Sequence, residues 1–117
     1  MIRVYQDKNN STLIIKKFII EENFIVLGGG TLAFDDDYID IVHAQINEGV
    51  DLKYYDLLIR SMLNIVKDLD MFKIRLAINL GADDQKLSVY QRLGFYKQGD
   101  YYIVSAKDIN FKGSCNG

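Results

Sequence analysis

The side chain of this sequence that is best suited to accepting a proton near neutral pH belongs to its single histidine, His43. An imidazole changes its protonation state between about pH 5 and 8, so His43 could act as a general base if it lined a cleft. The alternation of residues 38–46 predicts a strand. The residues expected to share the face of His43 are Ile39, Ile41 and Gln45. A half-buried sheet residue without a catalytic role would leave the same pattern.

Two short runs of identical residues could bind charged ligands. Gly28–Gly30 is followed by Thr31 and could suggest a phosphate-binding loop. The Lys-Ser/Thr pair and the helix of such loops are missing, so a strand with a bulge is the preferred interpretation. Asp35–Asp37 could attract a cationic acceptor such as a polyamine, or bind a divalent cation weakly, but it lacks the spaced ligands of a calcium loop. A solvated turn is the preferred interpretation of this run.

The composition sets bounds on the chain as a whole. With 117 residues, of which 49% are hydrophobic and 26% charged, the sequence predicts one globular domain over residues 1–117. A net charge of -2 argues against a nucleic-acid partner. No run approaches the roughly 18 apolar residues of a membrane helix. One cysteine and one histidine cannot form a zinc cluster, so we expect a cytoplasmic protein without a metal site.

Hydrophobic periodicity divides the chain into four strands, a helix, a strand, a second helix and a final strand or bent hairpin. The first helix is expected to begin at Tyr55 and to end near Asp70, after a stripe that includes Leu69. The second helix is expected to be capped by Asp83 or Asp84 and to end at Arg92. The expected strands cover residues 2–5, 12–20, 24–34, 38–46, 73–80 and 95–104, and a frayed tail covers 112–117. This order predicts an α/β fold with a mixed sheet (α+β), in which the first four strands are mainly antiparallel.

The second helix and the strand after it carry a specific pattern. Leu87, Tyr90 and Leu93 are spaced to share one helix face. Gly94 stands where a helix commonly ends in a left-handed residue, and Phe95 opens an alternating aromatic run. A short helix, a glycine stop and an aromatic strand in this compact form resemble the C-terminal part of the Gcn5-related N-acetyltransferase (GNAT) superfamily.

The family pattern in this part is Asn-x-x-Ala-x-x-apolar-Tyr-x-x-x-Gly-Phe. It falls on Asp83, Lys86, Val89, Tyr90, Gly94 and Phe95. The tyrosine and the Gly-Phe pair are kept, whereas Asp83 and Lys86 depart from the pattern. The resemblance extends over residues 17–104, is strongest over 74–104, and implies a GNAT-like fold.

The resemblance also implies an activity, the transfer of an acetyl group from acetyl-CoA as cosubstrate to an amine. In family enzymes the tyrosine at the position of Tyr90 is often the acid that protonates the departing thiolate. Asp40, His43 or Glu48 would then assist deprotonation of the amine. The alternative for Tyr90 is a core residue with a satisfied hydroxyl.

The pyrophosphate site of the family fits this sequence less well. The family binds the pyrophosphate after the fourth strand through a Gln/Arg-x-x-Gly-x-Gly/Ala signature, whose defining positions fall here on Asp51, Tyr54 and Asp56. All three depart from the signature. Cofactor contacts would have to come from Tyr54, Tyr55, Asp56 and Leu57, and the carboxylate of Asp56 could cap the helix amides itself.

Charge in the same region opposes an anionic ligand. Lys53 is the only basic residue within 35–56, a segment with many acidic residues: Asp35, Asp36, Asp37, Asp40, Glu48, Asp51 and Asp56. Carboxylates repel phosphate, so the sequence predicts a pyrophosphate site that has been lost or rebuilt.

The N-terminal part is shorter than the family's. Members usually have a helix pair between the first two strands, but here only the five turn-like residues Asp7–Ser11 stand in that interval. The acceptor side is therefore either open or covered by a partner subunit, as in a homodimer. Two functions follow: an atypical acyl-CoA-dependent N-acetyltransferase acting on a small amine or a protein amine, or a catalytically inactive GNAT-like binding or assembly module that does not bind acetyl-CoA. A third interpretation is an unrelated small α+β fold.

Overall fold

A computed structural model describes residues 1–78 and 83–111 of the chain. The end of the strand predicted for 73–80 and the frayed tail predicted for 112–117 lie outside the described residues. Among the described residues, no helix is long and apolar enough to cross a membrane.

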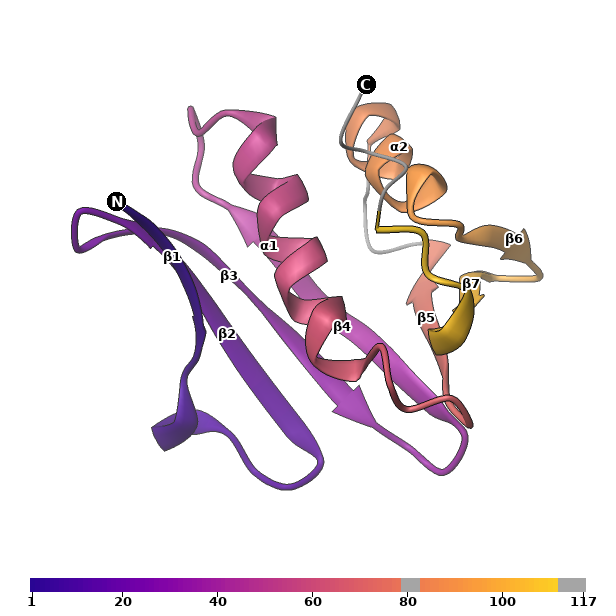
Figure 1. Ribbon diagram of the computed structural model, residues 1–117. Helices are drawn as coiled ribbons and strands as arrows, with labels where there is room; N and C mark the ends of the chain where they lie inside the picture. Colours follow the sequence, from indigo (N-terminus) through magenta and orange to yellow (C-terminus); the bar gives the residue numbers. More distant parts are fainter. Residues whose placement is uncertain (79–82, 112–117) are drawn as a thin grey trace.

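The protein is built on one seven-stranded sheet in the order β1-β2-β3-β4-β5-β7-β6 (Figure 1). The strands are β1 (Ile2–Gln6), β2 (Ile15–Glu22), β3 (Ile25–Phe34), β4 (Tyr38–Ile46), β5 (Lys73–Ala77), β6 (Tyr96–Gln98) and β7 (Tyr101–Ser105). Neighbouring strands are antiparallel except β4 and β5, which are parallel. The mixed sheet predicted from the sequence is confirmed, and the final segment forms the hairpin β6–β7.

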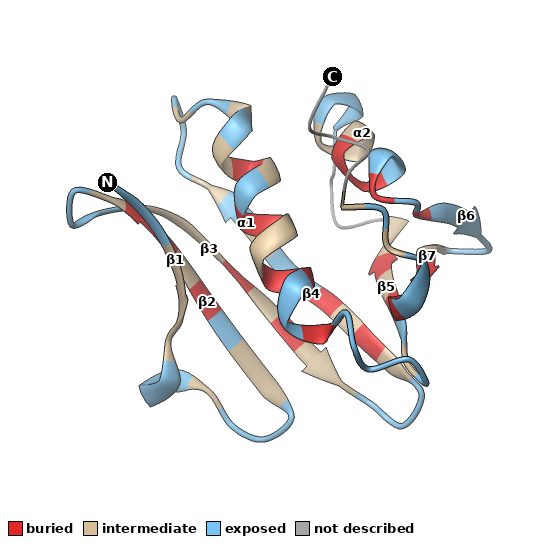
Figure 2. Ribbon diagram, in the orientation of Figure 1, coloured by how far each residue is buried: buried red, intermediate tan, exposed pale blue. Residues whose placement is uncertain are grey.

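The two α-helices within the described residues, α1 (Leu52–Val66) and α2 (Asp84–Arg92), lie on the same face of the sheet (Figure 1). The apolar stripe of α1 supplies the largest part of the helix contribution to the buried core, which is completed by strand residues such as Ile41 and Leu76. Figure 2 shows this buried layer as bands on the helices and on the strands behind them. The opposite face of the sheet is covered by neither α1 nor α2, and we refer to it as the helix-free face.

Capping explains where the helices begin. α1 begins at Leu52, three residues before the predicted start, because the Asp51 carboxylate accepts a hydrogen bond from the Lys53 amide. It ends at Val66, so the prediction that Leu69 belongs to its stripe is wrong, and Leu69 is 38% exposed. α2 ends at Arg92 as predicted, and Asp83 is its N-cap.

A bulge in β4 overturns one prediction about His43. The pairing of β3 with β4 shifts at Val42, because Thr31 lies opposite His43 whereas Leu32 lies opposite Ile41. The extra residue reverses the alternation of the strand beyond it. Ile41 therefore points into the core and His43 is exposed on the helix-free face, so the prediction that the two share a face is wrong.

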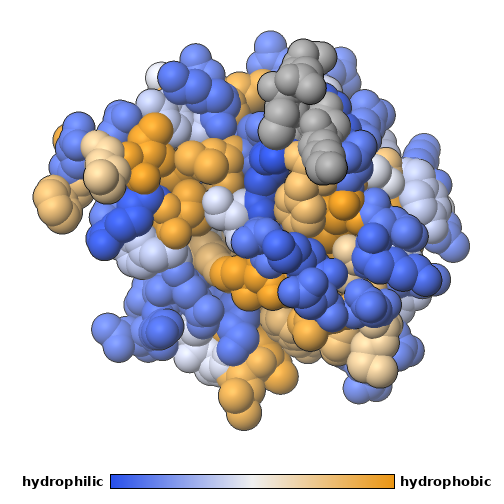
Figure 3. Space-filling view, in the orientation of Figure 1, coloured by the Kyte–Doolittle hydropathy of each residue, from blue (hydrophilic) through white to orange (hydrophobic). Residues whose placement is uncertain are grey.

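The turn between β2 and β3 places a phenylalanine in a conformation that favours glycine. Asn23 and Phe24 have φ angles of 51° and 69°, and the Phe24 side chain is 88% exposed. Figure 3 shows hydrophobic side chains gathered at this end of the molecule. Left-handed backbone costs a residue with a Cβ atom roughly 1–2 kcal/mol, so local strain is not offset here by burial.

Phe24→Gly is expected to stabilise the protein by about 0.5–1 kcal/mol, since glycine removes the left-handed penalty but loses more entropy on folding. Thermal unfolding would measure the change. Phe24→Ala is the matched control, because alanine removes the same ring and keeps the Cβ atom. Equal destabilisation by both variants would mean that the ring, and not the backbone, determines the stability of this turn.

Candidate functional site

The sheet opens between β4 and β5. These strands pair only from Tyr38 to Asp40 and from Lys73 to Arg75. β4 continues to Ile46 and β5 to Ala77, so the two strands separate beyond the Asp40–Arg75 position. Backbone groups of separated strands are left free to bind an extended ligand. We refer to this separation as the β4–β5 opening.

α1 starts just after β4 ends, but its first amides are partly used by the protein. The Asp51 Oδ1 atom lies 2.9 Å from the Lys53 amide nitrogen, so a carboxylate occupies the place that a phosphate would take at this helix start. The Tyr54 hydroxyl donates to the Glu22 carboxylate at 3.2 Å. Tyr54 therefore points toward β2 and leaves the helix start uncovered.

The other predicted cofactor residues are dispersed around α1. Tyr55 is buried in the core, whereas the Leu57 side chain is 37% exposed. Asp56 is not the cap, and its Oδ1 atom is buried without a hydrogen-bond partner among the described residues. The start of α1 thus fits a pyrophosphate poorly, because it has a carboxylate on one amide and a second carboxylate within the first turns.

Tyr90 lies at the centre of the buried layer. Its hydroxyl oxygen is 2.6 Å from that of Tyr55, and the two side chains are 0% and 3% exposed. The ring of Tyr90 packs edge-on against the rings of Tyr55 and Phe95, at centroid distances of 6.1 and 5.3 Å. The layer also contains Ile41 and Leu76, the first residues of β4 and β5 beyond their last pair.

Burial controls the ionisation of this tyrosine pair. Burial raises the pKa of Tyr90 well above its ordinary value, and the neighbouring Tyr55 raises it further by charge and by hydrogen bonding. Burial also raises the pKa of Tyr55, partly offset by its hydrogen bond to Tyr90. Both phenols are consequently protonated at neutral pH, which is the state that an acid requires.

Asp40 is held by Arg75, a residue that no local sequence pattern indicates. The Arg75 Nε and Nη2 atoms donate to the two carboxylate oxygens of Asp40 at 2.6 and 3.1 Å. The guanidinium lies 3.9 Å from the ring centroid of Tyr38 and 4.7 Å from that of Tyr101. The hydrogen bond to Asp40 raises the pKa of Arg75. Asp40 is therefore a structural ion-pair partner at the β4–β5 opening, and its carboxylate is not free.

His43 and Glu48, the other predicted bases, are both exposed. His43 borders a shallow hollow of about 280 Å³ on the helix-free face, together with Asp7, Lys17 and Thr31. Tyr90 lies on the opposite side of the sheet. The structure therefore brings Tyr90 together with Tyr55 and leaves the three predicted bases outside that pair.

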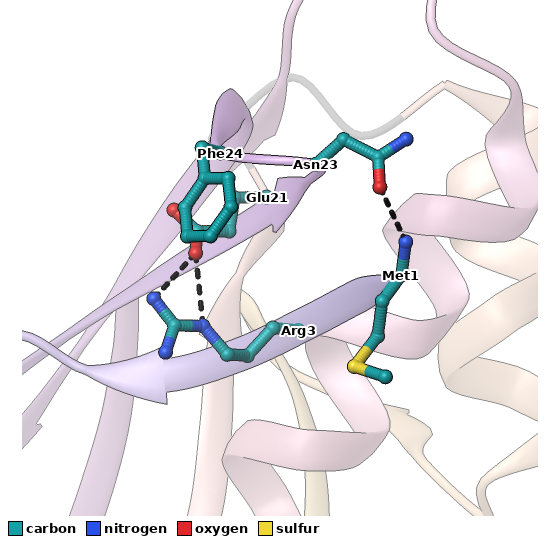
Figure 4. A pocket seen from close by; sticks show the side chains of 5 residues that line it. All are labelled: Met1, Arg3, Glu21, Asn23 and Phe24. Atoms are coloured by element: carbon teal, nitrogen blue, oxygen red, sulfur yellow. Dashed lines mark hydrogen bonds and ion pairs between the residues drawn. The ribbon is translucent and has the colours of Figure 1, made fainter.

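A second, smaller hollow of about 170 Å³ lies at the far end of β1 and β2 (Figure 4). It is lined by Met1, Arg3, Glu21, Asn23 and Phe24. Glu21 is only 7% exposed, and its Oε1 atom accepts from the Arg3 Nε atom at 2.8 Å. This ion pair links β1 to β2. No group of three or more metal-ligating side chains occurs among residues 1–78 and 83–111.

Comparison of the sequence with protein families and with curated proteins gives no match. Comparison of the structure with solved structures does. The ribosomal-protein-S18-alanine N-acetyltransferase from Escherichia coli superposes with a TM-score of 0.72 over 88% of this chain and 91% of that one, at 9% identity. A GNAT family acetyltransferase from Elizabethkingia anophelis, with acetyl-CoA bound, gives a TM-score of 0.67 over 83% and 77%, at 12% identity.

An N-acetyltransferase from Staphylococcus aureus Mu50 gives a TM-score of 0.66 over 91% of this chain and 98% of that one, at 12% identity. Identities this low support the fold and nothing finer. The β4–β5 opening, the helix that follows β4 and the helix–Gly-Phe ending agree with that likeness. The chain has the GNAT fold, the fold of the Gcn5-related N-acetyltransferases.

Proposed function

We propose that this protein is an atypical N-acyltransferase that takes an acyl group from acetyl-CoA and transfers it to an amine. The observation that carries the proposal is the β4–β5 opening, next to a buried layer that contains a protonated phenol pair. The opening can receive an extended thioester arm along the strand edges, and the pair can supply a proton. The start of α1 supports only weak binding of the pyrophosphate.

The proposed reaction is direct attack of the amine nitrogen on the thioester carbonyl. Tyr90 is the acid that gives a proton to the departing sulfur. The amine would approach from the helix-free face, because the buried layer fills the other side of the sheet. On that face Asp40 is engaged by Arg75, so the exposed His43 and Glu48 are the candidates for accepting the surplus proton of the amine.

The charges around the opening favour a cationic acceptor. Glu48 and Asp51 are exposed in the turn after β4, at the open end of the strand. Asp35, Asp36 and Asp37 are exposed in the turn before β4, at the end that is paired with β5. A small polyamine or a lysine side chain of a protein would be attracted to the acidic side chains at the open end. The acidic surface thus attracts a cationic acceptor and repels the phosphates of acetyl-CoA.

A second function is favoured by one specific observation, the Asp51 carboxylate that accepts a hydrogen bond from the Lys53 amide at the start of α1. A helix that supplies its own anion needs no phosphate. In this alternative the protein is a catalytically inactive module, and its helix-free face is covered by a second copy of the chain. The two functions differ in whether acetyl-CoA binds.

Calorimetric titration with acetyl-CoA and CoA tests the proposal. The same titration of the Asp51→Asn variant tests the effect of the Asp51 charge on binding. Asparagine keeps an oxygen that can cap the helix but removes a charge that repels the pyrophosphate. A unit-charge interaction near 4 Å is worth about 1 kcal/mol in water and more near a protein surface, so we expect a rise in affinity of at least about fivefold. The wild type should bind saturably in the micromolar to millimolar range.

Asp68→Asn is the matched control, because Asp68 is exposed beyond the other end of α1 and its replacement changes the net charge equally. That variant should bind like the wild type. If neither ligand binds the wild type or Asp51→Asn at millimolar concentration, the acyltransferase proposal fails and the inactive module is favoured. Analytical ultracentrifugation of the free protein would then test for the second copy.

A further inference from the structure

The Tyr55–Tyr90 pair holds one hydroxyl proton more than its own hydrogen bond uses. The two hydroxyls have two protons, and the contact of 2.6 Å between the oxygens is made by one of them. Among the described residues, neither hydroxyl has another hydrogen-bond partner. Both side chains are almost fully buried, so the second proton is a buried donor that has no acceptor within residues 1–78 and 83–111.

The surroundings of the two phenols differ. Tyr55 lies in the first turns of α1, where the positive end of the helix dipole acts on it. The Lys86 ammonium lies 5.3 Å from the centroid of the Tyr55 ring. Tyr90 has neither and is enclosed by Tyr55 and Phe95. The Asp83 carboxylate acts in the opposite direction and raises the pKa of Tyr55. The pKa of Tyr90 is raised well above its ordinary value, so a transient negative charge is still more stable on Tyr55 than on Tyr90.

We propose that Tyr55 and Tyr90 form a two-phenol proton relay, in which Tyr55 replaces the proton that Tyr90 gives up. The inference rests on the proposed acyl transfer and assigns Tyr55 a role in it. Two phenols at 2.6 Å can exchange a proton without moving their rings. The Lys86 ammonium stabilises the charge at the outer end of the relay.

At the acyl carbon, one bond forms and one bond breaks in the proposed transfer. The amine nitrogen bonds to the acyl carbon, and the carbon–sulfur bond breaks with its electron pair moving to sulfur. Tyr90 gives its proton to sulfur and takes the proton of Tyr55. Tyr55 is reprotonated through solvent by the surplus proton of the amine. The products are an amide and a thiol, and both tyrosines are again neutral.

Tyr55→Phe tests the relay in the full chain with acetyl-CoA and a polyamine as substrates. It should lower kcat about tenfold and leave the KM for acetyl-CoA unchanged, because Tyr90 keeps its own proton but is reprotonated slowly after each turnover. The double variant Tyr55→Phe/Tyr90→Phe should be no slower than Tyr90→Phe alone, since residues that act as a unit are not additive. Additive losses, or an unchanged kcat in Tyr55→Phe, would overturn the relay while the proposed function stands.

Spectrophotometric titration of tyrosinate gives a second readout that does not need turnover. Tyr55 raises the pKa of Tyr90, so Tyr55→Phe should move the ionisation of Tyr90 to lower pH. The hydrogen bond from Tyr90 lowers the pKa of Tyr55, so Tyr90→Phe should move the ionisation of Tyr55 to higher pH. Shifts in these opposite directions support a coupled pair; no shift in either variant overturns it. A wild type that neither binds acetyl-CoA nor turns it over overturns the proposed function and the relay together.

Discussion

Replacing Tyr90 with phenylalanine is expected to lower kcat about 100-fold or more and to leave the KM for acetyl-CoA nearly unchanged. General acids contribute typically 10²–10⁴-fold to a rate, and the ring of the variant still fills the same space. The hydroxyl acts only when the sulfur departs, so its loss falls on kcat. Steady-state kinetics with a polyamine acceptor, followed through release of the thiol, would measure the change.

The same substitution also has a cost in stability, which the experiment must separate from catalysis. Tyr90→Phe leaves the buried Tyr55 hydroxyl without its partner, at a cost of about 1–3 kcal/mol. Assays well below the melting temperature of the variant remove this effect from kcat.

Tyr102→Phe is the control for Tyr90→Phe. Tyr102 is a half-buried tyrosine of β7 that packs against the same core. Its variant should keep the wild-type kcat. A Tyr90→Phe variant that matches Tyr102→Phe in kcat would assign Tyr90 to packing alone and would remove the acid from the proposed mechanism.

The C-terminal half of the fold could be predicted because its signals are local. The spacing of Leu87, Tyr90 and Leu93 and the left-handed Gly94, with φ of 103°, depend on the chain within one short helix. The bounds of β4 followed equally from its alternation. Each of these features is decided by neighbouring residues, whatever the rest of the sheet does.

The features that the sequence did not disclose depend on register. Val42 looks like an ordinary strand residue, yet the bulge there moves His43 away from Ile41 to the other face. Arg75 meets Asp40 only because β4 and β5 pair in one particular register, which no local pattern specifies.

The N-cap of α1 was hard to predict for a similar reason. Asp51 and Asp56 are both plausible N-caps, and the choice of Asp51 becomes visible only once the backbone of the preceding turn is placed. The predicted site was therefore harder to assemble than the predicted fold, since its parts come from separate elements.

Replacing Gly28 with alanine is expected to destabilise the protein by at least about 3 kcal/mol. A Cβ atom built on Gly28 would lie 2.2 Å from the Gln45 carbonyl oxygen and 2.7 Å from the Ile46 Cα atom. Both contacts are with backbone, so β4 must move away from β3 instead of a side chain turning aside. Overpacking a well-packed core typically costs about 1–3 kcal/mol, and a displaced strand lies at the upper end or beyond.

Thermal unfolding should register this change as a fall of more than about 10 °C in Tm. Gly49→Ala is the matched control, because Gly49 has a φ of 83° but no atom lies within 4 Å of its built Cβ. That variant should be destabilised only by the cost of left-handed backbone, roughly 1–2 kcal/mol. Equal losses of stability in Gly28→Ala and Gly49→Ala would mean that β3 and β4 tolerate the extra Cβ atom.

The position of Gly28 couples this stability effect to the site. Gln45 and Ile46 form the end of β4, from which the chain passes directly into the turn that holds Asp51 and the start of α1. A displaced β4 end would therefore move the helix start relative to β5 and change the width of the β4–β5 opening. If the opening receives acetyl-CoA, Gly28→Ala should weaken binding at temperatures where the variant is still folded, whereas Gly49→Ala should weaken it less. Retained affinity in a folded Gly28→Ala protein would place the binding site elsewhere.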